Sequence, residues 1–169
     1  MNSPPSEGAL TPTPEMQRLA ALLAGTWDMT LTYAPGPLAS EGGTGTGQET
    51  SRPGPGGLSL FIETTAGGPA GQYEAGGIIE WSPTQHVYKL HWVSSLSHVG
   101  SYFDGNWVEE DLVFNGTENL MGQAFASRHT ITNIRTDAFL YTIDIGATHD
   151  QLERTITIEY TKRPEAQEE

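Results

Sequence analysis

The sequence predicts an all-β protein: an antiparallel up-and-down β-barrel of about nine or ten strands, preceded by one short N-terminal helix. Apolar residues alternate with polar ones along much of the chain, which is the period of a half-buried strand. The 169 residues include 20 glycines and 11 prolines, and many of them separate the alternating segments as turn signals. No helical pattern lies between successive strands, so folds built from parallel βαβ units are excluded.

The single helix is expected over residues 15–24. Leu19, Leu22 and Leu23 have the i, i+3, i+4 spacing that forms one apolar stripe, and Gly25 ends the pattern. A helix of about ten residues is marginal in isolation. We therefore expect it to pack against the barrel, near one end.

After this helix the hydrophobic period changes from 3.6 to 2. Asp104-Gly105 and Asn115-Gly116 are dipeptides that favour tight hairpin turns, and Gly76-Gly77 inside a strand predicts a bulge or a sharp bend. The clearest alternating segments are 26–33, 58–63, 72–81, 86–93, 139–145 and 155–161.

An antiparallel barrel is the natural closure of such strands, because closure removes exposed sheet edges. A β-sandwich is the alternative. We expect one barrel domain over residues 15–163, a disordered N-terminal arm over 1–14, and a short acidic tail over 164–169, since both ends are polar and rich in helix and strand breakers.

Composition excludes several classes of protein. The 21 acidic residues outnumber the 8 lysines and arginines, and a formal charge of −13 repels nucleic-acid phosphates. The absence of cysteine excludes disulfides, thiolate zinc sites and a cysteine nucleophile. No apolar run suits a signal peptide or a membrane helix, so we expect a cytoplasmic protein without nucleic-acid or membrane partners.

Several local motifs resemble a known family, the bacterial lipocalin-like domains of unknown function in the calycin superfamily. The resemblance covers most of residues 19–163. It implies a barrel with a ligand-sized cavity, in which Trp27 begins the first strand and packs across the closed end. The matching motifs are Leu22-Leu23-Ala24-Gly25-Thr26-Trp27, Gly56-Gly57, Gly76 with Ile79-Glu80-Trp81, Tyr88-x-Leu90-His91-Trp92-Val93-x-Ser95, and Glu159-Tyr160-x-Lys162-Arg163.

A more distant resemblance is to the nitrobindin-like haem barrels, which also open with Gly-Thr-Trp. In that group alternating glycines follow, and the last strand carries an axial histidine. Here Asp28-Met29-Thr30 follows, and residues 152–162 contain no histidine. We therefore expect no haem, and nothing in the sequence implies another cofactor.

Two polar residues are predicted to point into the barrel. His129 shares a strand face with Ser127 and Ile131, and Arg154 precedes Ile156 by two residues. In a pocket they would form its hydrogen-bonding or charged ends, with Arg154 able to hold a carboxylate in bidentate fashion. The structural alternatives are a salt bridge at the rim for Arg154 and a buried, hydrogen-bonded imidazole for His129.

Aromatic residues are the candidate walls of such a pocket. Tyr88, Trp92, Tyr102 and Tyr141 combine apolar area with a hydroxyl or indole donor, which suits a ligand site. Each could equally be an ordinary core residue. His91 faces away from Trp92 by alternation and is predicted to lie on the surface. The histidines have no metal-binding spacing, so no metal site is expected.

The function expected from these features is the binding of a small, partly apolar molecule inside the barrel, with a carboxylate as one option for its polar end. One alternative is a barrel enzyme of isomerase or cyclase type, using an interior histidine or tyrosine as acid or base. Another is a filled barrel that acts as a dimerisation domain. A homodimer is left open, and no catalytic residue is assigned.

Overall fold

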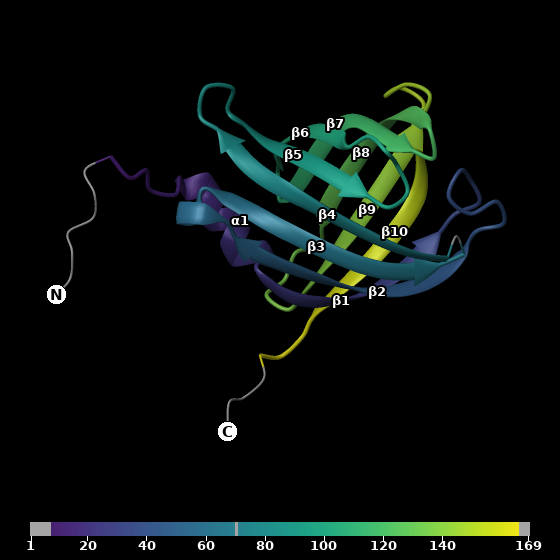
Figure 1. Cartoon of the computed structure of the whole chain (residues 1–169), viewed down its shortest axis with the longest axis horizontal. Helices are drawn as coiled ribbons and strands as arrows, with labels where there is room; N and C mark the ends of the chain where they lie inside the picture. The colour runs from purple at the N-terminus through teal and green to yellow at the C-terminus, as the bar shows by residue number, and fades with distance from the viewer. Residues whose placement is uncertain (1–7, 70, 166–169) are drawn as a thin grey trace.

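A computed structural model describes residues 8–69 and 71–165, and it confirms the predicted all-β barrel. Ten antiparallel strands form one closed sheet, in which each strand pairs with its neighbours in the chain and the last strand pairs with the first (Figure 1). The sandwich alternative is wrong, because there is one continuous sheet. The elements are α1 (Pro14–Leu23), β1 (Gly25–Tyr33), β2 (Gly43–Pro53), the 3-10 turn η1 (Pro55–Gly57), β3 (Ser59–Gly68), β4 (Gly71–Ser82), β5 (Val87–Ser94), β6 (Ser101–Val108), β7 (Asp111–Leu120), β8 (Gln123–Thr132), β9 (Ala138–Gly146) and β10 (Glu153–Lys162).

Parts of the predicted arm and tail lie outside the described residues, namely residues 1–7 of the arm and residues 166–169 of the tail. Residues 9–13 contain no helix or strand. The proposed division of the chain into arm, domain and tail stays a prediction.

The helix packs at one end of the barrel, against β2, β3 and β4 (Figure 1). It is shifted by one residue from the predicted 15–24, and Met16, Leu19 and Leu23 form its buried stripe. The indole Nε1 of Trp27 donates to the carbonyl of Leu23 at 2.9 Å, which joins the end of the helix to the first strand. Large side chains fill this end: Trp27, Leu60, Tyr88 and Leu112 are fully buried.

The two predicted hairpin turns at Asp104-Gly105 and Asn115-Gly116 are wrong. Both dipeptides lie inside strands, with Asp104 opposite Asn115, Gly105 opposite Phe114 and Gly116 opposite Phe103 in the β6–β7 register. The chain reverses instead at residues 109–110, between β6 and β7, and at residues 121–122, between β7 and β8. Gly105 and Gly116 therefore serve packing and not chain reversal.

Glycine inside a strand leaves room for an aromatic ring on the neighbouring strand. A Cβ on Gly105 would overlap the ring of Phe114, and one on Gly77 would lie 2.6 Å from the ring of Trp92. Gly77 pairs with Trp92 in an unbroken register, so the predicted bulge at Gly76-Gly77 is wrong. The absent side chains leave the space that both rings occupy.

We expect Gly105→Ala to lower the free energy of unfolding by about 1–3 kcal/mol, because the added methyl group overpacks the site of a buried ring. Urea denaturation of the two proteins measures this difference. Gly36→Ala is the control, since a Cβ there has 3.9 Å to its nearest neighbour and should change stability little. Equal midpoints for Gly105→Ala and Gly36→Ala would contradict the packing role of Gly105.

Candidate functional site

A cavity of about 100 Å³ lies inside the barrel. It runs from the middle of the barrel to the end opposite α1, because its wall includes strand ends such as Tyr33, Tyr73 and Leu120. Most of its wall is aliphatic or aromatic, and no lysine or arginine among the described residues lines it. The polar side chains that reach it are Tyr33, Glu49, Thr64, Tyr73, Ser94, Glu118, His129, Tyr141 and Tyr160.

The first polar cluster is centred on Glu49 of β2. The register places Glu49 opposite Trp27, whose side chain points inward, so the carboxyl points inward too. The side chains of Thr64 and Tyr160 both donate to its Oε2, each at 2.9 Å. Glu49 is only 8% exposed, yet its Oε1 accepts no hydrogen bond from the described residues.

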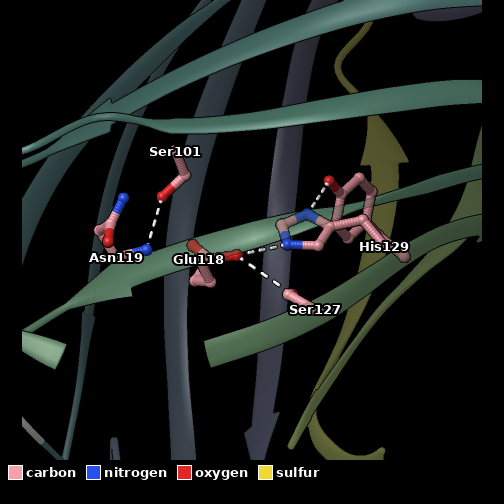
Figure 2. Close-up of polar contacts among 6 residues, drawn as sticks. Ser101, Glu118, Asn119, Ser127 and His129 are labelled. Carbon is pink, nitrogen blue, oxygen red and sulfur yellow. Dashed lines mark hydrogen bonds and ion pairs between the residues drawn. The ribbon is translucent and has the colours of Figure 1, made fainter. Parts of the chain in front are cut away.

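The second cluster is centred on Glu118 of β7. Ser127 donates to its Oε2 at 3.2 Å, and the same oxygen lies 2.6 Å from Nε2 of His129 (Figure 2). These three side chains come from the adjacent strands β7 and β8 and are all buried, with Glu118 5% exposed. Both contacts end on one oxygen, so Oε1 of Glu118 is also without a partner in the described part of the chain.

A tyrosine extends this second cluster. The hydroxyl of Tyr141 lies 2.6 Å from Nδ1 of His129. Burial raises the pKa of Tyr141 well above its ordinary value, so its hydroxyl keeps its proton. A protonated hydroxyl can donate or accept, so the tautomer of His129 sets the direction of the bond at Nδ1, while Nε2 faces the Glu118 carboxyl. The hydroxyl, imidazole and carboxyl groups of these three side chains are therefore hydrogen bonded in series.

The two clusters approach each other through tyrosines on β9 and β10. The rings of Tyr141 and Tyr160 are 6.2 Å apart, and Tyr160 stacks on Phe139 at 4.4 Å. Burial raises the pKa of Tyr160 well above its ordinary value, and the negative charge of Glu49 raises it further. Both hydroxyls therefore remain protonated. Tyr160 donates to Glu49, and Tyr141 is bonded to His129.

The carboxyl group of Glu49 is a weaker acid than an ordinary glutamate. Burial raises its pKa from the ordinary 4.5 to about 7, although the hydrogen bonds from Thr64 and Tyr160 act in the opposite direction. The reason is that the carboxylate loses its hydration without gaining a cation. Glu49 therefore changes its charge close to neutral pH.

Three of the sequence-predicted site residues reach the cavity: Trp92, His129 and Tyr141. Tyr88 does not line it, because the ring is buried under α1 and its hydroxyl donates to the carbonyl of Glu15 at 2.8 Å. Tyr102 lies on the outer face, 64% exposed and stacked on His91. The outward direction predicted for His91 is thereby confirmed.

The prediction that Arg154 points into the barrel is wrong. Its side chain is 52% exposed and forms an ion pair with Asp144 on β9. The β9–β10 register shifts between Arg154 and Ile156, so the alternation that holds from Ile156 onward does not extend back to Arg154. The argument for a carboxylate ligand rested on this arginine and is lost with it.

Sequence reasoning missed both carboxyl groups. Residues 43–53 of β2 contain no large apolar side chain, so they have no hydrophobic alternation to mark Glu49. The signal that was available is the alternation of threonines at 44, 46 and 50, which favours a strand. Glu118 was hidden by the false turn at Asn115-Gly116, although it shares its strand face with Phe114 and Leu120.

The fold and the site define a closed ten-stranded barrel with a polar cluster in an apolar cavity. The chain belongs to the family of proteins of unknown function DUF1579, whose model matches residues 11–162. No curated protein matches the sequence.

Among solved structures, the chain is similar to Rv2717c from M. tuberculosis, with a TM-score of 0.63 and 11% identity over 90% of this chain and 99% of that one. This likeness shows the fold. The chain is also similar to a redesigned β-barrel, mFAP1, bound to DFHBI, with a TM-score of 0.48 and 18% identity over 86% of this chain and 99% of that one.

Two further findings concern the described residues. They contain no group of three or more histidine, aspartate or glutamate side chains able to hold a metal ion. They also contain no helix that is long and apolar enough to cross a membrane.

We expect Glu49→Gln to remove a pH dependence of stability. The folded-state pKa of about 7 exceeds the ordinary 4.5, so the folded protein holds an extra proton between these values. The titration of Glu49 should therefore lower the free energy of unfolding of the wild type by about 2–3 kcal/mol as the pH rises from 4.5 to 7. Urea denaturation at about pH 5 and pH 8 measures the fall.

The glutamine variant should lack this contribution and should be more stable than the wild type at about pH 8. Glu80→Gln, an exposed position on β4, removes the same charge from the outer surface and is the control. If Glu49→Gln and Glu80→Gln lose stability equally with rising pH, Glu49 does not have a raised pKa.

Proposed function

We propose that the protein binds a small, partly apolar molecule inside the barrel. The observation that carries this proposal is the pair of buried carboxyl groups, each with one oxygen that no described residue satisfies. Neither oxygen is closed off from solvent or cavity, because among the described residues the fully buried side-chain oxygen or nitrogen without a partner is Ser51 Oγ. Both carboxyl groups line the cavity. A ligand with hydrogen-bond donors would bond to the free oxygens, and the apolar wall would cover the hydrocarbon part of the ligand.

The size of the cavity limits the ligand. Its volume of about 100 Å³ is smaller than the roughly 150 Å³ of an engineered cavity that takes up benzene. We therefore expect a compound with a short alkyl chain, or one with a single ring if side chains such as Trp92 move aside.

The placement of Trp27 supports the assignment to the calycin superfamily, which we keep as part of the proposal. The indole is fully buried at the α1 end and bonds to the helix, as the Gly25-Thr26-Trp27 resemblance implies. A cytoplasmic location, a bacterial source, the absence of haem and a homodimer remain predictions.

A specific observation also favours an acid–base enzyme as a second candidate. Tyr141, His129 and Glu118 are hydrogen bonded in series, the arrangement in which a carboxylate orients an imidazole that exchanges a proton with a hydroxyl. If these three side chains catalyse proton transfer, a ligand that co-purifies with the protein should take up deuterium from D₂O. Mass spectrometry should find this uptake in the wild type and not in His129→Gln.

We expect Trp92→Ala to weaken the binding of benzyl alcohol about tenfold, because the indole supplies roughly 60 Å² of apolar contact. An NMR titration measures the affinity, and circular dichroism checks the fold. Tyr102→Ala removes an aromatic ring from the outer face and should leave the affinity unchanged. Equal binding by a folded Trp92→Ala variant would exclude Trp92 from the site.

A further inference from the structure

We propose that the cavity selects a small amine, whose ammonium group binds at the free oxygens of Glu49 and Glu118. This inference rests on the proposed function of ligand binding, and it names the chemical class of the ligand. It follows from the charges that line the cavity, from the direction of its hydrogen-bonding groups, and from the shape of its wall.

The charge inside the barrel is negative. Glu49 and Glu118 both line the cavity, while none of the described cationic side chains of lysine or arginine does. Three ion pairs lie on the outer surface: Lys89 with Asp104, Arg154 with Asp144, and Arg163 with Asp28. Both ring nitrogens of His129 already have partners, Tyr141 and Glu118. A cationic ligand is therefore attracted and an anionic one repelled, and burial strengthens both effects.

The hydrogen-bonding groups also favour an ammonium group. The hydroxyl of Tyr160 already donates to Glu49, and that of Tyr141 is already bonded to His129, so the groups left free in the two clusters are the carboxyl acceptors. An ammonium group has three N–H donors and no acceptor. An alcohol has only one donor, and bonds that involve charged groups are roughly twice as strong as neutral ones.

Glu49 on β2 and Glu118 on β7 line the cavity from opposite sides of the barrel. The hydroxyl of Tyr141 belongs to the Glu118 cluster, and the negative charges of Glu49 and Glu118 both raise its pKa. The remaining wall is formed by side chains such as Met29, Trp92 and Ile158, which suit the hydrocarbon part of an amine. Aromatic rings can also face a cation.

Binding of an amine should release protons near neutral pH. Glu49 has a pKa of about 7, so part of the population is protonated there. An incoming ammonium group keeps its own three protons and pairs with the carboxylate, and the carboxyl proton goes to the buffer. A neutral alcohol leaves the carboxyl as it is and releases nothing.

The test compares benzylamine with benzyl alcohol and benzoate by isothermal titration calorimetry at about pH 8. Butylamine and butanol form a slimmer second pair in case the ring does not fit. We expect each amine to bind about tenfold or more tightly than its alcohol, because a hydrogen bond to a charged group contributes about 1.5–3 kcal/mol. Benzoate should not bind.

Two variants locate the ammonium group. Glu49→Gln and Glu118→Gln should each weaken the amine about tenfold and change the alcohol by less than about twofold, since glutamine keeps the shape and removes the charge. Glu80→Gln removes an equal charge from the outer face of β4 and should change neither.

The wild type gives a second measurement that needs no variant. At pH 7, titrations in phosphate and Tris buffers should differ in enthalpy for the amines and agree for the alcohols, because only the amines displace a proton. Equal affinity of amine and alcohol, with no proton release, would overturn the amine proposal and leave the binding function standing. If amines, alcohols and benzoate all fail to bind, the binding function itself is wrong.

Discussion

The pairing of β1 with β10 is the contact on which the rest of the structure depends. Seven consecutive residue pairs, from Trp27 opposite Lys162 to Tyr33 opposite Ile156, join the two ends of the sheet. Closure turns ten inner strand faces into a single interior. It also brings residues 111 positions apart, Glu49 and Tyr160, within one hydrogen bond. Without it the two carboxyl groups would face solvent and would be ordinary surface acids.

The interior divides into a filled half and a hollow half. Near α1, large rings occupy the space, and glycines such as Gly105 remove the side chains that would compete with them. Toward the other end, the tyrosines and carboxyl groups leave space between them. Large packed rings thus fill one half of the barrel, and the polar side chains that line the cavity lie mostly in the other half.

Much of the fold follows from the sequence, because strand period and breaker residues report directly on local structure. The strand over residues 155–161 and the leucine stripe of α1 are examples. The errors have a common cause in tertiary packing: Asn115-Gly116 has the local chemistry of a turn, yet the Phe103 ring needs that glycine inside a strand. His129, Trp92 and Tyr141 could be found by alternation, whereas Glu49 could not, since closure alone buries it.

The helix closes one end of the barrel. Leu23 and Trp27 join the end of the helix to β1, and the hydroxyl of Tyr88 holds the first turn of the helix on the barrel. Leu38, Leu96 and Leu120 line the cavity at the opposite rim. A ligand of the kind proposed would pass these apolar side chains on entry and exit, so its residence time and its binding strength would depend on separate sets of residues.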